Sequence, residues 1–221
     1  FNICTTVLLF PVSDWIIKLA KKIGRVEEDS QDKSMVQLDE RVLQTPGLAL
    51  QSTVNEVIRM GQIVEDSLMV AKDVLFTLKD GDIQFLKEEE ATVDRLSAGI
   101  TNYAIKVGAL QISEKEHQDV AHLLQVVSDM ERISDYCENI SEFAETLYEK
   151  KASFSEIGEE QLKEMMEVCT DSYRYALKAF ENQDRAMALK VIEKETQADN
   201  LELRLRNKHI QRLANNQCKT E

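Results

Sequence analysis

The sequence has little of the residues that interrupt helices. Only two prolines and seven glycines occur among its 221 residues. No stretch alternates between apolar and polar side chains in the way that a half-buried strand does. Leu, Ala, Glu and Lys, which favour helices, are abundant. The composition therefore predicts an all-α protein that is long enough to bury a core, as one large domain or two small ones.

Positive charge is also scarce. The chain carries 27 lysines and arginines against 40 aspartates and glutamates, which gives a formal net charge of −13. This balance argues against binding to nucleic acid and against docking on anionic lipid, because both attract basic surfaces. It suits a protein that attracts cations.

Cysteine and histidine are few, and they are not spaced as the ligands of a zinc site. The cysteines form no Cys-x-x-Cys pair, which argues against a disulfide framework and a zinc finger. The histidines form neither His-x-x-x-His nor His-Glu-x-x-His, and we expect surface or capping roles for them. These residues are Cys4, Cys137, Cys169, Cys218, His117, His122 and His209.

Catalytic signatures are missing as well. The sequence contains no phosphate-binding loop, no nucleotide-binding fingerprint and no nucleophile placed beside a base. A carboxylate-bridged di-iron enzyme would require two inward-facing Glu-x-x-His pairs, and the chain does not provide two. We therefore expect a protein that is not an enzyme.

Apolar residues recur at helical spacing over five long segments. Ser113-Glu114-Lys115-Glu116 is a capping box and marks the start of the third segment. Short connections between long helices predict antiparallel neighbours in a bundle. The predicted helices run from about 48 to 78, from a turn at 79–82 to about 110, from 114 to about 148, from a loop at 150–158 to about 182, and from 184 to about 215.

Residues 1–22 differ from the rest of the chain. They are apolar up to Phe10 and amphipathic beyond Pro11, and they fall short of the roughly 20 apolar residues that span a bilayer. Two interpretations are open, a buried N-terminal helix or the end of a transmembrane helix. Basic residues follow, which favours a cytosolic location for what comes next. We expect the end of a last transmembrane helix at 1–22, a linker at 23–47 and a helical domain at 48–221.

An internal repeat relates two parts of the helical domain. At an offset of 105 residues, several positions are identical without a gap, among them Asp66-Ser67, which recurs as Asp171-Ser172, and Glu90 and Asp94, which recur as Glu195 and Asp199. We expect a first repeat at about 48–149 and a second at about 155–221, with the last helix of the second repeat missing from this chain.

Three Glu-x-x-x-Asp pairs lie in or beside the apolar stripes of their helices. Residues four apart share one face of a helix, and like charges there destabilise it slightly, so their repetition calls for a compensating cation. The first two pairs lie on consecutive antiparallel helices and can face each other across one groove. The pairs are Glu90 with Asp94, Glu131 with Asp135, and Glu195 with Asp199.

The role of these carboxylates is open at this point. Four converging carboxylates form a hard, oxygen-rich site that suits Mg²⁺, Mn²⁺ or iron. Alternatively, Arg95 and Arg132 pair with the acids in a structural salt-bridge network without metal. A solvated helix face is the usual explanation of a single pair. If metal binds, Glu195 and Asp199 would be half of a second site.

The stretch from Asp129 to Ile140, together with the repeated Glu-x-x-x-Asp helices, resembles the PhoU family. The resemblance implies two antiparallel three-helix bundles that bind metal clusters through these motifs, and a role in phosphate uptake and its regulation. The metal is open among iron, manganese, magnesium and zinc. The residues that the resemblance assigns to metal binding are Glu90, Asp94, Glu131, Asp135, Glu195 and Asp199.

The first part of the chain is similar to the domain junction of bacterial sodium/phosphate cotransporters, in the cotransporter II-related family. Leu38-Asp39-Glu40-Arg41, Thr45-Pro46 and Arg59-Met60-Gly61 are among the residues that carry this likeness. It implies a multi-pass cell-membrane protein whose PhoU-like domain lies on the cytoplasmic side. There the domain would modulate sodium-dependent phosphate symport by its own membrane domain.

Departures from the family pattern keep other functions open. Ser134-Asp135-Tyr136 stands where family members often have Gly-Asp-His, and the fourth acidic motif is absent from the chain. A free-standing PhoU-type adaptor in phosphate signalling is one alternative, and a metal-free helical scaffold is another. The expected partners are the membrane transporter domain, with phosphate and sodium acting through it, and a second copy in a homodimer. Nucleic acid is not an expected partner.

Overall fold

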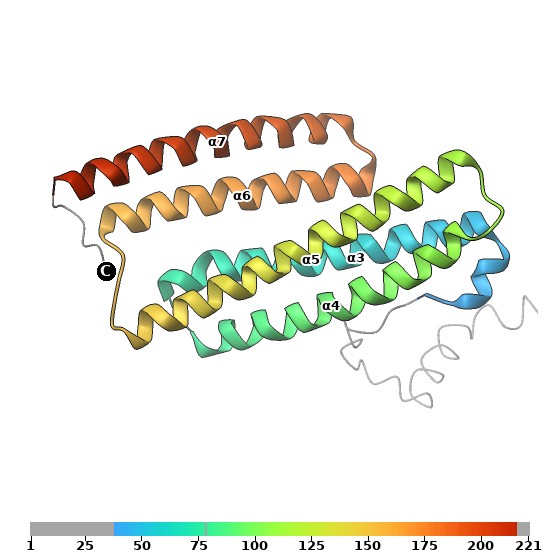
Figure 1. Ribbon diagram of the computed structural model, residues 1–221, viewed down its shortest axis with the longest axis horizontal. Helices are drawn as coiled ribbons and strands as arrows, with labels where there is room; N and C mark the ends of the chain where they lie inside the picture. The colour runs from blue at the N-terminus through green and yellow to red at the C-terminus, as the bar shows by residue number, and fades with distance from the viewer. Residues whose placement is uncertain (1–37, 78, 216–221) are drawn as a thin grey trace, which may run out of the picture. The chain divides into compact units, whose positions relative to one another are not determined.

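The computed structural model describes residues 38–77 and 79–215, all of which belong to one unit formed by residues 36–221. These residues form helices and no strand, so the all-α prediction is confirmed (Figure 1). The predicted membrane-helix end at 1–22 lies outside the described residues. The elements are the 3₁₀-helix η2 (Glu40–Gln44) and the α-helices α3 (Pro46–Thr77), α4 (Asp80–Gly108), α5 (Glu114–Glu149), α6 (Glu156–Asn182) and α7 (Arg185–Ala214).

Side-chain caps fix where three of the helices begin. The Ser113 hydroxyl accepts from the Glu116 N–H at 3.3 Å, and the Glu116 carboxylate accepts from the Ser113 N–H at 2.7 Å. This reciprocal pair is the predicted capping box, which is confirmed. Ser155 and Asp184 cap α6 and α7 by accepting from N–H groups of the first turn. Caps of this kind each contribute about 1 kcal/mol.

Two helix starts differ slightly from the prediction. α3 begins at Pro46, because proline suits the first helical position, where its missing N–H leaves no bond unmade. The lead-in before it forms η2, which is capped by the Asp39 side chain. α4 begins at Asp80, so Gly81 and Asp82 lie in its first turn and not in the predicted turn.

The helices form a group of three and a group of two. Successive helices run antiparallel, and α3, α4 and α5 pack against one another (Figure 1). α6 packs against α3 on one side and against α7 on the other. The described residues therefore hold one three-helix bundle and a pair of further helices, while the repeat bounds stay a prediction.

The core lies mainly inside the three-helix group. Burying each large apolar side chain there contributes roughly 1.5–3 kcal/mol. In α6 and α7, by contrast, the buried residues are Thr170, Leu177 and Leu201. Fully buried large apolar residues of the three-helix group include Val57, Met60, Val64, Leu86, Val93, Leu96, Ile100 and Val127.

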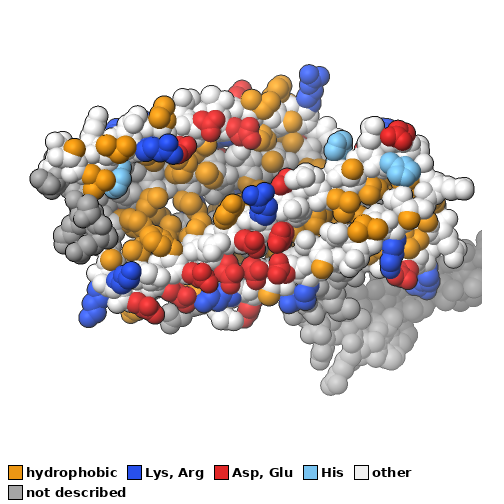
Figure 2. All heavy atoms as spheres, in the orientation of Figure 1, with side chains coloured by type: hydrophobic (Ala, Val, Ile, Leu, Met, Phe, Trp, Pro, Cys, Tyr) orange, Lys and Arg blue, Asp and Glu red, His pale blue; other side chains and the backbone are white. Residues whose placement is uncertain are grey.

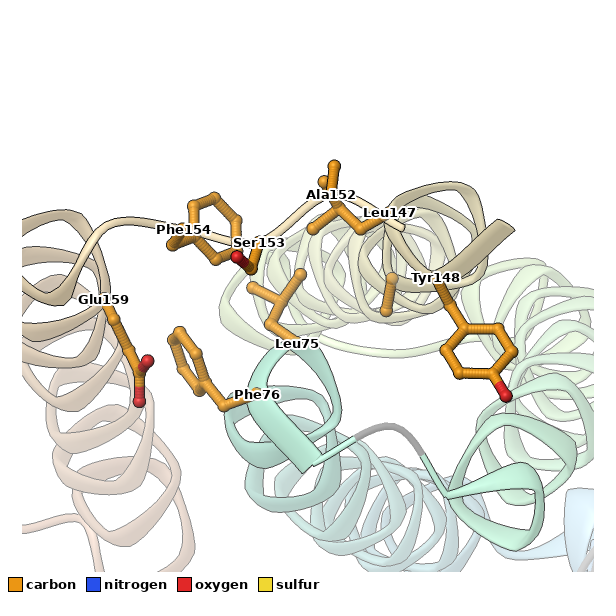
Figure 3. A pocket seen from close by; sticks show the side chains of 9 residues that line it. Leu75, Phe76, Leu147, Tyr148, Ala152, Ser153, Phe154 and Glu159 are labelled. Carbon is orange, nitrogen blue, oxygen red and sulfur yellow. The ribbon is translucent and has the colours of Figure 1, made fainter. Parts of the chain in front are cut away.

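The connection from α5 to α6 is held by aromatic packing. The ring centroid of Phe154 lies 6.1 Å from that of Phe76 in α3 and 6.4 Å from that of Phe143 in α5. Figure 3 shows Phe154 and Phe76 at the edge of a small hollow whose lining is mostly apolar, with Glu159 of α6 beside it. Because polar groups do not converge there, we assign the hollow to packing of this connection and not to a ligand.

Candidate metal centre

The packing of α4 against α5 brings two of the predicted acidic pairs together. Glu90 and Asp94 lie one turn apart on α4, and Glu131 and Asp135 lie one turn apart on α5. Because the two helices run antiparallel and pack along their length, the pairs meet near the middle of both. Figure 2 shows acidic side chains gathered over this part of α4 and α5.

Three carboxylates converge closely in this groove. Glu90, Asp94 and Asp135 each offer an oxygen, and these three oxygens lie within 4.8 Å of one another. Glu90 and Asp135 are half-buried, whereas Asp94 is exposed. Three anionic groups at this separation repel one another, so the site favours either a bound cation or a retained proton.

The protonation of Glu90 reflects that repulsion. Burial, the charges of Asp94, Glu138 and Asp135, and a hydrogen bond with Asp94 together raise the pKa of Glu90 from 4.5 to about 7. Without a cation, a proton therefore stays on this carboxyl near neutral pH. A metal ion would displace that proton, since a ligating carboxylate must be ionised.

Glu131 lies beside the three-oxygen group but is not part of it. Its side chain is half-buried. Burial and the negative charges of Asp135 and Asp94 raise its pKa, while the nearby Arg132 acts in the opposite direction. Glu131 therefore belongs to the same electrostatic cluster, one turn from Asp135, and its predicted role as a metal ligand stays a prediction.

Glu138 is a member of the cluster that the sequence analysis missed. It lies three residues after Asp135 and seven after Glu131, so these residues share one face of α5. Its side chain is half-buried, and its charge adds to the rise in the pKa of Glu90. The signal was present in the sequence, because Glu-x-x-x-Asp-x-x-Glu continues the pair by one more turn of the same stripe.

The alternative of a salt-bridge network is not supported. Arg95 donates to the Thr92 hydroxyl at 3.3 Å, and its side chain is otherwise exposed. Arg132 is exposed as well. Among the described residues, neither arginine forms a salt bridge with Glu90, Asp94 or the α5 carboxylates. The cluster therefore keeps a negative charge that protein cations do not neutralise.

The third pair is arranged differently. Glu195 and Asp199 are both exposed on α7, which packs against α6 alone among the helices described. Among the described residues, no third acidic side chain converges with this pair. Among the described helices, none covers α7 in the way that α5 covers α4, and the assignment of Glu195 and Asp199 to half of a metal site stays a prediction.

Histidine does not enter the groove. The chain has one Glu-x-x-His spacing, Glu114 and His117, which the sequence analysis overlooked. Both residues are exposed at the start of α5, where the Nδ1 atom of His117 lies 3.1 Å from the Ser113 carbonyl oxygen. His117 therefore lies at the surface of α5, which is one of the two roles expected for the histidines.

The donor set fits a hard cation. Carboxylate oxygens are the usual ligands of Mg²⁺, Mn²⁺ and iron, whereas zinc in structural sites prefers cysteine and histidine. If a cation is bound, Glu90, Asp94 and Asp135 would hold it directly, with Glu131 and Glu138 at the two ends of the groove. Such an ion would replace repulsion between two helices by attraction to a shared charge.

Comparison with known proteins decides the family. A family model described as the PhoU domain matches residues 57–144 and 162–221, which is more than half of the chain. The chain belongs to the PhoU family. The match includes α4 and α5 across the acidic groove, and it resumes within α6 and continues through α7.

Relatives of this PhoU-family chain carry names from phosphate transport. The YjbB protein of Salmonella typhimurium, whose name refers to inorganic phosphate export, is 23% identical over 215 residues, or 96% of this chain and 39% of the relative. The PhoU homolog of Aquifex aeolicus, by name a phosphate-specific transport system accessory protein, is 28% identical over 153 residues, or 69% of this chain and 68% of the relative. No solved structure matches the chain significantly.

The narrower resemblance to sodium/phosphate cotransporters is not supported. The names of these relatives refer to phosphate export or to phosphate-specific transport, and none refers to a sodium cotransporter. This chain spans 39% of the length of the YjbB relatives that it matches. The coarser conclusion stands, that the chain is a PhoU-family protein whose relatives are named for phosphate transport and phosphate export.

The expected location in a multi-pass cell-membrane protein is wrong. Relatives from Aquifex aeolicus, Xylella fastidiosa and Synechocystis are named accessory proteins of a phosphate-specific transport system. Over residues 38–77 and 79–215, none of the helices has both the length and the apolar character needed to cross a membrane. The corresponding prediction for residues 1–22 lies outside the described residues.

Proposed function

We propose that this chain is a PhoU-type accessory protein that regulates phosphate transport, and that it does so with a metal ion in the groove between α4 and α5. Membership of the PhoU family supports the first part, together with relatives named for phosphate-specific transport and phosphate export. The free-standing adaptor is the form of this function that those accessory relatives favour.

One observation supports metal binding most strongly. Glu90, Asp94 and Asp135 come from two neighbouring helices, and their oxygens lie within 4.8 Å of one another without a salt-bridging arginine or lysine. Folding brings these charges together at a cost, and a bound cation would offset that cost. Oxygen ligands make Mn²⁺, Mg²⁺ or iron the expected ions.

The proposed mode of action is binding and not catalysis. A groove of carboxylates without a neighbouring nucleophile or histidine suits an ion that organises two helices. A phosphate transporter is the proposed partner, with a homodimer as a further possibility for the assembly. The transporter is proposed because relatives are named accessory proteins of a phosphate-specific transport system.

Elemental analysis of the purified protein tests metal binding. We would compare the parent with Glu90→Gln/Asp135→Asn, which keeps side-chain shape and removes two charges from the groove. The chain provides a matched control in Glu195→Gln/Asp199→Asn, which makes the same kinds of change on exposed positions of α7. We expect stoichiometric metal in the parent and in the control, and its loss in the groove variant.

Two outcomes would contradict the metal site. If all three proteins carry no metal and show no affinity for Mn²⁺, Mg²⁺ or iron, the groove is not a metal centre. If both double variants lose metal equally, binding is a general effect of negative charge. A metal-free scaffold would then be the better description, and the groove variant should be more stable than the parent.

A further inference from the structure

Three helices converge on one glycine in the middle of α3. A Cβ atom added to Gly61 would lie 2.6 Å from the Leu177 Cδ1 atom of α6 and 2.8 Å from the Met130 Cε atom of α5. Real Cβ contacts are not that short, so a side chain at Gly61 would force the ends of the Leu177 and Met130 side chains to move. We call Gly61, Met130 and Leu177 the Gly61 junction.

The Gly61 junction also anchors α6 to α3. One turn from Leu177, the Tyr173 hydroxyl donates to the Gly61 carbonyl oxygen at 2.9 Å. The next residue, Arg174, donates to the Glu65 carboxylate at 2.9 Å. Both bonds join the same short stretch of α3 to the same turn of α6, so this stretch sets where α6 sits on the three-helix group.

The position of α7 depends on the same turn of α6. Lys194 of α7 donates to the Asp171 carboxylate at 2.8 Å, and Arg174 lies 3.5 Å from the other oxygen of Asp171. Since α7 packs against α6, a shift of this turn would carry α6 and α7 together. The α6–α7 pair is thus positioned on the three-helix group by the residues around the Gly61 junction.

The junction borders the acidic groove through α5. Met130 is the residue before Glu131, and it is buried against Gly61 while Glu131 faces α4. A cation shared by α4 and α5 would draw the acidic face of α5 toward α4. A shift of α5 as a whole would move the Met130 side chain relative to Gly61 and Leu177.

We propose that the Gly61 junction couples occupancy of the acidic groove to the position of the α6–α7 pair. This inference rests on the proposed metal binding, and it adds that the ion changes the other half of the molecule. Close-packed contacts transmit such a shift because the interior has no free volume to absorb it. Coupling between two sites is reciprocal, so a change at the junction must also change the affinity for the ion.

Gly61→Ala is the main variant for the test, and Gly47→Ala is its matched control. Gly47 lies on the same helix, but a Cβ atom there would meet nothing within 4 Å. Mn²⁺ affinity is measured by titration calorimetry on the full chain. We expect Gly61→Ala to shift the Mn²⁺ dissociation constant by about fivefold or more, in the range typical of coupled sites, while Gly47→Ala leaves it unchanged. If Gly61→Ala does not fold, Leu177→Ala replaces it, because Leu177 lies outside the groove.

Hydrogen exchange of the parent with and without saturating Mn²⁺ gives the second readout. We expect Mn²⁺ to change amide exchange in residues 170–180 of α6 as well as in α4 and α5. Changes confined to α4 and α5, with equal affinities for Gly61→Ala and the parent, would overturn the coupling and leave metal binding intact. Absence of any heat of binding, with exchange unchanged throughout, would instead refute the metal site itself.

Discussion

Glu90→Gln should stabilise the metal-free protein at alkaline pH. Glutamine keeps the size of the side chain and its capacity for hydrogen bonds, but it removes one of three converging negative charges. In the parent the pKa of Glu90 is raised to about 7, by burial first and then by Asp94, Glu138 and Asp135. Above that pH the carboxyl ionises and the full repulsion appears.

The size of the effect follows from the spacing of the charges. The carboxylate oxygens of Glu90, Asp94 and Asp135 lie within 4.8 Å of one another. Two unit charges at that separation repel by about 0.9 kcal/mol in a water-like medium. At the effective dielectric constant of a protein surface the same repulsion is about 3.5 kcal/mol. The groove is partly open to solvent, so we expect Glu90→Gln to raise the free energy of unfolding by about 2 kcal/mol at pH 8.

The sign of the pH dependence follows from proton binding. Glu90 holds a proton up to about pH 7 in the folded protein, but only up to its ordinary value of 4.5 in the unfolded chain. Unfolding releases that proton between these values, so its contribution to stability is present below pH 4.5 and is lost as pH rises through 7. The advantage of Glu90→Gln should therefore be small at pH 5 and large at pH 8.

Urea denaturation of the metal-free proteins, followed by circular dichroism at both pH values, measures this difference. Glu195→Gln is the control, because Glu195 is the repeat equivalent of Glu90 but is exposed on α7. We expect the control to stay within about 0.5 kcal/mol of the parent. Equal stability of Glu90→Gln and the parent at pH 8 would refute the repulsion on which the metal proposal depends. With saturating Mn²⁺ the order should reverse, since the parent alone gains full binding energy.

Three further predictions concern the groove, a helix cap and the core. Glu138→Gln should weaken Mn²⁺ affinity about tenfold, as the loss of groups around metal ligands commonly does; unchanged affinity in calorimetry would place Glu138 outside the centre. Ser113→Ala should lower the free energy of unfolding by about 1 kcal/mol because it removes the cap of α5, whereas Ser153→Ala in the exposed connection should not change it measurably in urea denaturation. Leu96→Ala, at a fully buried position, should cost about 2–5 kcal/mol. Leu203→Ala, at a position that is 57% exposed, should cost less than about 0.5 kcal/mol, and equal costs would contradict the assignment of the core to the three-helix group.

The positions of the helices can be predicted from local sequence. Their periodic apolar residues, the Ser113 capping box and the scarcity of proline and glycine predict where they run, and the structure places them within a few residues of that prediction. The adjustments at Pro46 and Asp80 are local as well. The Glu-x-x-x-Asp pairs are equally visible, because spacing along one helix fixes which side chains share its face.

Tertiary packing decided which of those acidic pairs converges with carboxylates of another helix. Glu90/Asp94 and Glu195/Asp199 have the same spacing and lie at equivalent places in the repeat. Within the part of the chain that the structure describes, only the first pair meets a carboxylate from another helix. The difference arises because α5 covers α4 while no described helix covers that face of α7. The sequence by itself determined helices, caps and the faces on which charges lie. Only the fold determined which faces meet, and therefore where repulsion accumulates and which side chains lie against Gly61. The reason is that distances between helices depend on packing, which no local sequence pattern contains.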